Sequence, residues 1–115
     1  MEARAVARYV PIAPRKVRLV ADLVRNRDVE SALETLKFSN KAGAAAINKV
    51  MRSALANAGQ DPSINVDDLY VKSILVDNGP IRYWARFKGR LHISRIRRRR
   101  CHITVILDDD LEQMS

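Results

Sequence analysis

The chain has 115 residues, enough for one domain with a modest core and too few for two. It is 47% apolar and 30% charged, an ordinary composition for a folded protein, and no apolar run approaches the length of a membrane span. Its single cysteine excludes an internal disulfide, argues against a cysteine zinc site and favours a reducing, cytoplasmic setting. The N-terminal segment MEARAVARYV lacks the apolar core of a secretory signal. We therefore expect one domain over residues 1–115.

The net charge of +8 is concentrated in one segment. Residues 80–100 hold nine basic side chains and no acidic one, whereas residues 1–79 hold twelve basic and nine acidic. Residues 101–115 hold four acidic residues and no Lys or Arg. A basic segment attached to a nearly neutral domain indicates a polyanionic partner.

Alternation of side-chain character predicts a strand over residues 3–10, at the edge of a sheet because it carries arginines. Pro14 suits the first turn of a helix, and apolar spacing predicts that helix over about residues 14–25. Arg15, Lys16 and Arg18 lie at its start, where the helix dipole disfavours cations. Phosphate binding could offset this small cost.

Two more helices follow. Asp28 is the expected N-cap of a short helix that carries Val29 and Leu36. Ser39 or Asn40 is the expected cap of a third helix with a long apolar stripe, ending near Gly59.

The remaining elements are strands. Residues 61–68 indicate a loop, 69–76 a strand that closes at Asn78-Gly79-Pro80, and 102–107 a further strand. The acidic residues Asp108–Asp110 indicate a frayed, solvated tail and not a magnesium site, since three consecutive carboxylates do not converge without a special turn.

The basic segment itself alternates with a period of two, which predicts an extended β-hairpin over residues 80–100. A turn near Lys88-Gly89-Arg90 would give arms of about ten residues that project roughly 30 Å. Arginines and lysines neutralise phosphates, and flat rings stack on exposed bases, so this segment has the composition of an RNA-binding surface. For Tyr83, Trp84 and Phe87 a small apolar cluster at the hairpin base is the alternative to base stacking.

No catalytic set is evident. His92 and His102 have no carboxylate or cysteine partners at ligand spacing, and Cys101 is expected to be a buried, inert thiol. Neither a Gly-rich phosphate loop nor a Ser-His-Asp set occurs. We expect no enzyme activity, no metal, no cofactor and no small-molecule substrate.

Several segments resemble the bacterial-type ribosomal protein L twenty-two family. They read APRKVRLVADLVR (13–25), VESALETLKF (29–38), INKVMRSALANA (47–58), DLYVKSILVDNGP (68–80) and RRCHITVIL (99–107). The resemblance covers residues 3–107 and implies an α+β fold, in which a small, mainly antiparallel three-stranded sheet packs on three helices and a long hairpin projects. It also implies a structural protein of the large ribosomal subunit that binds large-subunit rRNA, assists early assembly and lines the nascent-peptide exit tunnel with its hairpin.

The resemblance and the composition of the basic segment together give the expected contact residues and partners. The expected rRNA contacts are Arg15, Lys16, Arg18, Arg82, Trp84, Arg86, Lys88, Arg90, Arg95, Arg97, Arg98, Arg99 and Arg100. The expected tunnel tip is Phe87, Lys88, Gly89, Arg90, Leu91 and His92, and here the sequence departs from the family's usual Pro-Arg-Ala-Lys/Arg-Gly-Arg-Ala. Expected partners are rRNA, other large-subunit proteins and the nascent peptide, without a membrane, in the cytoplasm or in an organellar ribosome. A DNA-binding regulator with a basic ribbon, normally a dimer, is the alternative.

Overall fold

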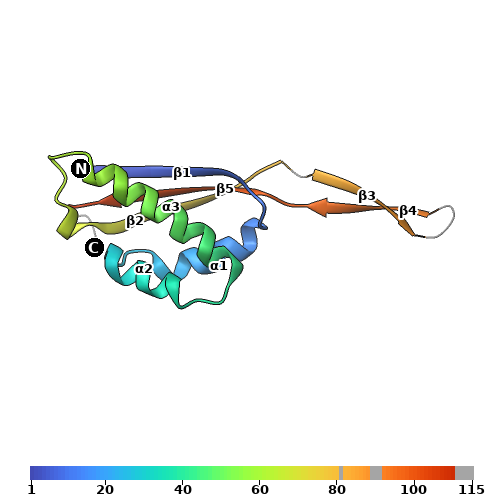
Figure 1. Cartoon of the computed structure of the whole chain (residues 1–115), viewed down its shortest axis with the longest axis horizontal. Helices are drawn as coiled ribbons and strands as arrows, with labels where there is room; N and C mark the ends of the chain where they lie inside the picture. The colour runs from blue at the N-terminus through green and yellow to red at the C-terminus, as the bar shows by residue number, and fades with distance from the viewer. Residues whose placement is uncertain (81, 89–91, 111–115) are drawn as a thin grey trace.

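The computed structural model describes residues 1–80, 82–88 and 92–110. The elements in chain order are β1 (Glu2–Val10), α1 (Pro14–Val24), α2 (Val29–Lys37), α3 (Ala42–Gly59), the short 3-10 helix η1 (Val66–Asp68), β2 (Tyr70–Asn78), β3 (Arg82–Lys88), β4 (His92–Arg98) and β5 (Cys101–Asp108). Helices and three strands gather at one end, and β3 and β4 project from it (Figure 1). The molecule measures 63 × 24 × 22 Å.

The main sheet has three antiparallel strands in the order β1-β5-β2. The central strand β5 turns alternate residues to the core, and Ile103, Val105 and Leu107 are fully buried. β1 is an edge strand, as its arginines predicted. β2 extends beyond the expected residue 76, because Asp77 and Asn78 pair with His102 and Cys101. The three-stranded antiparallel sheet is therefore confirmed.

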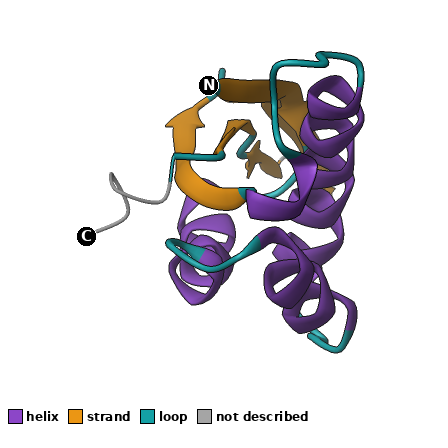
Figure 2. Cartoon of the chain, turned by 90° about the vertical axis from the view of Figure 1, so that its left-hand side faces the viewer, coloured by secondary structure: helices purple, strands orange, loops and turns teal. Residues whose placement is uncertain are grey.

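The three helices cover one face of this sheet, as Figure 2 shows. The apolar stripes predicted for α1 and α3 are the core, with Val17 and Val20 facing Ile47 and Met51 in one buried cluster. Gly43 lets the two helices approach closely, because a Cβ there would lie 3.2 Å from the Cα of Val17. The predicted α+β fold is confirmed.

Of the two predicted N-caps, one is correct and one is wrong. Asp28 caps α2 by accepting a hydrogen bond from the Ser31 N–H at 3.3 Å. The cap of α3 is Lys41, not Ser39 or Asn40. The Ser39 hydroxyl instead accepts from the Lys41 N–H at 3.4 Å, within the turn that precedes the helix.

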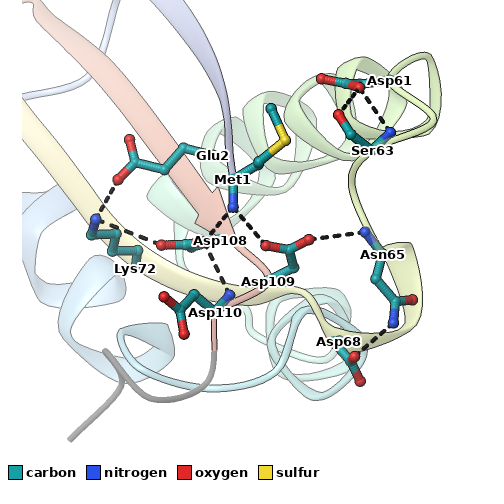
Figure 3. A network of polar contacts seen from close by, with 10 residues as sticks. All are labelled: Met1, Glu2, Asp61, Ser63, Asn65, Asp68, Lys72, Asp108, Asp109 and Asp110. Atoms are coloured by element: carbon teal, nitrogen blue, oxygen red, sulfur yellow. Dashed lines mark hydrogen bonds and ion pairs between the residues drawn. The ribbon is translucent and has the colours of Figure 1, made fainter.

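The acidic residues Asp108–Asp110 are not a solvated tail, so that prediction is wrong. Asp108 is paired in the sheet with Glu2 and Tyr70, and its side chain is only 4% exposed. Figure 3 shows the network that holds it: Asp108 accepts from the Asp110 N–H at 3.1 Å and forms an ion pair with Lys72 at 3.6 Å. Residues 111–115 lie outside the described residues.

The projecting hairpin pairs β3 with β4, from Arg82 opposite Arg98 to Lys88 opposite His92. Each strand has seven residues within the described part of the chain, where arms of about ten were expected. The turn predicted near Lys88-Gly89-Arg90 includes residues 89 and 90, which lie outside the described residues.

Candidate nucleic-acid interface

The start of α1 is a positively charged helix end. Pro14 occupies the first turn, the cap residue Ala13 provides no side-chain hydrogen bond, and the first turn has no acidic residue. Arg15 and Lys16 follow directly, both exposed. The partial positive charge of this helix end therefore adds to that of the two side chains, which suits an anion.

A cavity of about 220 Å³ lies between this helix start and the base of the hairpin. It is lined by Pro14, Arg15, Arg18, Asn78, Gly79, Arg99 and Arg100. Four arginines thus line one cavity, two from α1 and two from the segment between β4 and β5. Guanidinium groups bind phosphate oxygens in a two-pronged manner, so the cavity has the chemistry of a phosphate site.

Gly79 fixes the geometry on the hairpin side of this cavity. Its N–H donates to the Arg100 carbonyl oxygen at 2.9 Å, which extends the pairing of β2 and β5 by one step. A Cβ at this position would lie 3.1 Å from the same oxygen, closer than ordinary contact. Glycine therefore allows the two strands to approach where the hairpin leaves the sheet.

Arg18 has a structural contact that the sequence did not predict. Its Nη2 donates to the Val76 carbonyl oxygen in β2 at 2.9 Å. Arg25, the C-cap residue about two turns further on, donates to the Ile74 carbonyl oxygen at 2.9 Å in the same way. The two arginines tie α1 to β2, and Arg18 also holds its charge beside the cavity.

Cys101 lies behind the cavity and is fully buried. Burial raises the pKa of its thiol, although the nearby charge of Arg18 opposes that shift. A raised pKa reduces the thiolate fraction at neutral pH, and the thiolate is the reactive form. The prediction of a buried thiol is confirmed, and the chemistry disfavours a nucleophile.

The side chains that the structure describes include only part of the predicted rRNA-contacting set. Arg15, Arg18, Arg99 and Arg100 line one cavity, and Lys16 is exposed on α1 beside it. For the rest of the set the described part is the backbone of β3 and β4, on which lie Arg82, Trp84, Arg86, Phe87, Lys88, His92, Arg95, Arg97 and Arg98. Gly89, Arg90 and Leu91 lie outside the described residues.

Within residues 1–80, 82–88 and 92–110, no three His, Cys, Asp or Glu side chains are grouped to hold a metal ion. No helix in this part of the chain is long and apolar enough to cross a membrane. His102 has a protein partner, since its Nδ1 accepts a hydrogen bond from the Tyr9 N–H at 3.0 Å. Tyr9 itself was missed in the sequence, because nothing in its neighbours distinguishes it from an ordinary strand residue.

Comparison with known proteins gives concordant matches. The family described as ribosomal protein L22p/L17e matches residues 5–108. A large ribosomal subunit protein uL22 from Desulfotalea psychrophila is 49% identical over 110 residues, covering 96% of this chain and all of that protein. The protein of the same name from Thermus thermophilus is 50% identical over 95% of this chain and 96% of its own. The protein of that name from Staphylococcus aureus is 46% identical over 98% of this chain and 97% of its own length.

Matches of this extent show the class of protein to which the chain belongs. It is a structural protein of the ribosome that acts in translation, and not an enzyme. Within that class, the chain belongs to the ribosomal protein L22p/L17e family. The resemblance identified from the sequence segments is thereby confirmed.

Proposed function

We propose that this chain, as one domain of residues 1–115, is a constituent of the large ribosomal subunit that binds large-subunit rRNA. The observation that carries the proposal is the arginine-lined cavity between the start of α1 and the base of the hairpin. The names of its relatives support the assignment to the large subunit.

Phosphate contacts dominate the proposed binding. Arg15 and Arg18 on one side and Arg99 and Arg100 on the other hold backbone phosphates in the cavity, and Lys16 adds a contact beside it. The basic residues of β3 and β4 continue this contact along the hairpin, with Trp84 stacking on an unpaired base. Binding of this kind is static and has no chemical step.

The shape of the molecule supports two finer roles. β3 and β4 project from the domain along the 63 Å axis, so they can thread between RNA segments that the domain does not reach (Figure 1). We assign to the hairpin a role in early subunit assembly and to its tip, residues 87–92, the lining of the nascent-peptide exit tunnel. The partners are then rRNA, neighbouring large-subunit proteins and the passing peptide.

The salt dependence of rRNA binding tests the phosphate contacts. If the protein neutralises about six phosphates, log affinity falls with log salt concentration with a slope near −4 to −5. Replacing Arg99 and Arg100 with Gln makes the slope shallower by roughly 1.5. Lys37→Gln, at the exposed end of α2, leaves it unchanged. A slope near zero would contradict the proposal.

The alternative from the sequence, a DNA-binding regulator, is tested in the same assay. We expect a monomer in gel filtration and a complex with rRNA that excess duplex DNA does not displace. A dimer that prefers duplex DNA would favour the regulator.

A further inference from the structure

Tyr9 has a backbone conformation that calls for an explanation. It has φ 58°, in the left-handed region, at an irregularity of β1 where the register shifts between Ala7 and Val10. Residues other than glycine adopt this region rarely, and strained positions of this kind cluster at functional sites. The strand thus departs from regular geometry at an aromatic residue.

Two contacts fix Tyr9 in that conformation. Its N–H donates to Nδ1 of His102 at 3.0 Å, and its ring meets the His102 ring edge to face, with centroids 5.0 Å apart and planes at 87°. Even so, Tyr9 is 55% exposed. The fold therefore holds a large flat ring in one orientation at the surface, and does not bury it.

A groove of about 430 Å³ lies beside this ring, between β1 and α3. Its walls are mostly small apolar side chains from both elements, and Arg8, Lys49 and Ser53 supply its polar groups. An apolar groove with a few polar groups is the usual form of a binding site.

The charge around the groove is positive. α3 contains no acidic residue, and the only one in β1, Glu2, lies at the far end of the strand in an ion pair with Lys72. Among the residues paired in the sheet, the acidic one nearest to Tyr9 is Asp77 of β2. Asp77 pairs with His102, on the side of β5 that faces away from β1. Arg8 and Lys49 thus line the groove, and none of the residues that line it is acidic.

We propose that this groove holds an unpaired nucleotide of rRNA, with its base stacked on Tyr9 and its phosphates on Arg8 and Lys49. The inference rests on the proposed function and adds a second contact, whose lining residues are all different from those of the arginine cavity. An unpaired base is required, because a base inside a helix has no free face to stack on an aromatic side chain. The flat apolar ring of Tyr9, with cations beside it, fits the base and phosphates of a nucleotide better than it fits a neutral peptide.

His102 is a positioning residue in this site. Its Nδ1 accepts a hydrogen bond from the Tyr9 backbone N–H, and its ring packs against the Tyr9 ring. His102→Ala removes both contacts to Tyr9. It lowers rRNA affinity less than removal of the ring itself, and Tyr9→Asn combined with His102→Ala is no weaker than Tyr9→Asn alone.

The test measures equilibrium binding of the full chain to large-subunit rRNA at fixed salt. Tyr9→Asn removes the ring, while asparagine tolerates the left-handed backbone. We expect a loss of affinity of roughly 5- to 100-fold, the usual effect of removing one stacked ring. Tyr9→Phe keeps the ring and binds like the wild type. Phe38→Asn is the matched control, since Phe38 is 75% exposed at the end of α2 and outside the groove.

Salt dependence separates this site from the arginine cavity. Tyr9→Asn weakens binding with an unchanged salt slope, because no charge is lost, whereas Lys49→Gln makes the slope shallower by roughly 0.8. If Arg99 and Arg100 variants weaken binding but Tyr9→Asn and Lys49→Gln do not, the groove proposal is wrong and the proposed function stands. If none of them weakens binding, the proposed function fails as well.

Assembled subunits provide a test that does not depend on affinity. A photo-crosslinker placed at position 9 is expected to join rRNA at an unpaired base. Because β1 is an edge strand, a protein strand could pair with it instead. A crosslink only to a ribosomal protein would overturn the proposal.

Discussion

The carboxylate of Asp108 shows how a single residue couples the chain ends to the sheet. Burial alone would raise its pKa, but hydrogen bonds from the Asp110 N–H and the N-terminal ammonium outweigh this effect, and the net pKa is lowered from its usual 3.8. The charged form is therefore the one that the fold stabilises.

The lowered pKa of Asp108 makes the free energy of unfolding depend on pH in the acid range. The stabilisation by Asp108 is fully present above its ordinary pKa of about 4 and is lost as the pH falls through the lower value of the folded state. Urea unfolding across this acid range should show the wild type losing stability, and Asp108→Asn should flatten this part of the curve. Asp67→Asn, at an exposed position, should leave the wild-type curve unchanged. Equal curves for the wild type and Asp108→Asn would refute this account.

Arg18 and Arg15 of α1 are expected to differ in their effects on the stability of the protein and on its rRNA binding. Arg18 donates to the Val76 carbonyl oxygen, whereas the structure shows Arg15 exposed at the helix start. Arg18→Gln should lower the free energy of unfolding by about 1 kcal/mol and also weaken rRNA binding. Arg15→Gln should weaken rRNA binding alone. Chemical denaturation and filter binding on the two variants check this pair, and a stability loss in Arg15→Gln would contradict it.

At the residue scale, the sequence predicted where charged residues gather better than it predicted which groups their side chains contact. The cluster of Arg15, Lys16 and Arg18 was expected at the helix start, but the bond from Arg18 to β2 depends on a helix-to-strand distance that no local pattern contains. Asp108 was misjudged for a similar reason. A run of three acids resembles a tail, and only the pairing of β5 with both neighbours shows that the first of them is buried.

At the scale of elements, the packing of α1 on α3 depends on one close approach. A Cβ at position 43 would lie 3.2 Å from the Cα of Val17, and backbone of a buried helix cannot shift cheaply. Gly43→Ala gains up to about 1 kcal/mol of helix propensity but overpacks this contact, at a cost of about 1–3 kcal/mol. We expect net destabilisation in thermal unfolding. Gly59→Ala is the control, because nothing lies within 4 Å of its added Cβ, and it should be neutral or stabilising.

Periodicity explains why most elements were predictable. The 3.6-residue stripes of α1 and α3 and the alternation of β1 and β5 reflect burial on one side, which the hydrophobic pattern reports directly. The cap of α3 was not predictable in this way. Ser39, Asn40 and Lys41 all precede the stripe, and the hydrophobic pattern does not distinguish between them.

At the scale of the whole molecule, the core and the hairpin are separate. The buried cluster lies among the helices and the three-stranded sheet, and β3 and β4 pair with each other in a sheet of their own. Deleting residues 86–90 should therefore leave the thermal transition of the domain nearly unchanged while weakening rRNA binding. Loss of the cooperative transition would show that the hairpin stabilises the domain.

The position of the chain in the ribosome is the central claim, and crosslinking in purified ribosomes tests it most directly. The intact chain, carrying photo-crosslinkers in turn at positions 15 and 100 on opposite sides of the arginine cavity, would be incorporated into ribosomes. Crosslinks would then be mapped to rRNA by sequencing. We predict that the chain cosediments with the large subunit and that both positions crosslink to neighbouring nucleotides of its rRNA. Absence of the chain from the large subunit, or crosslinks from neither position to rRNA, would contradict the account.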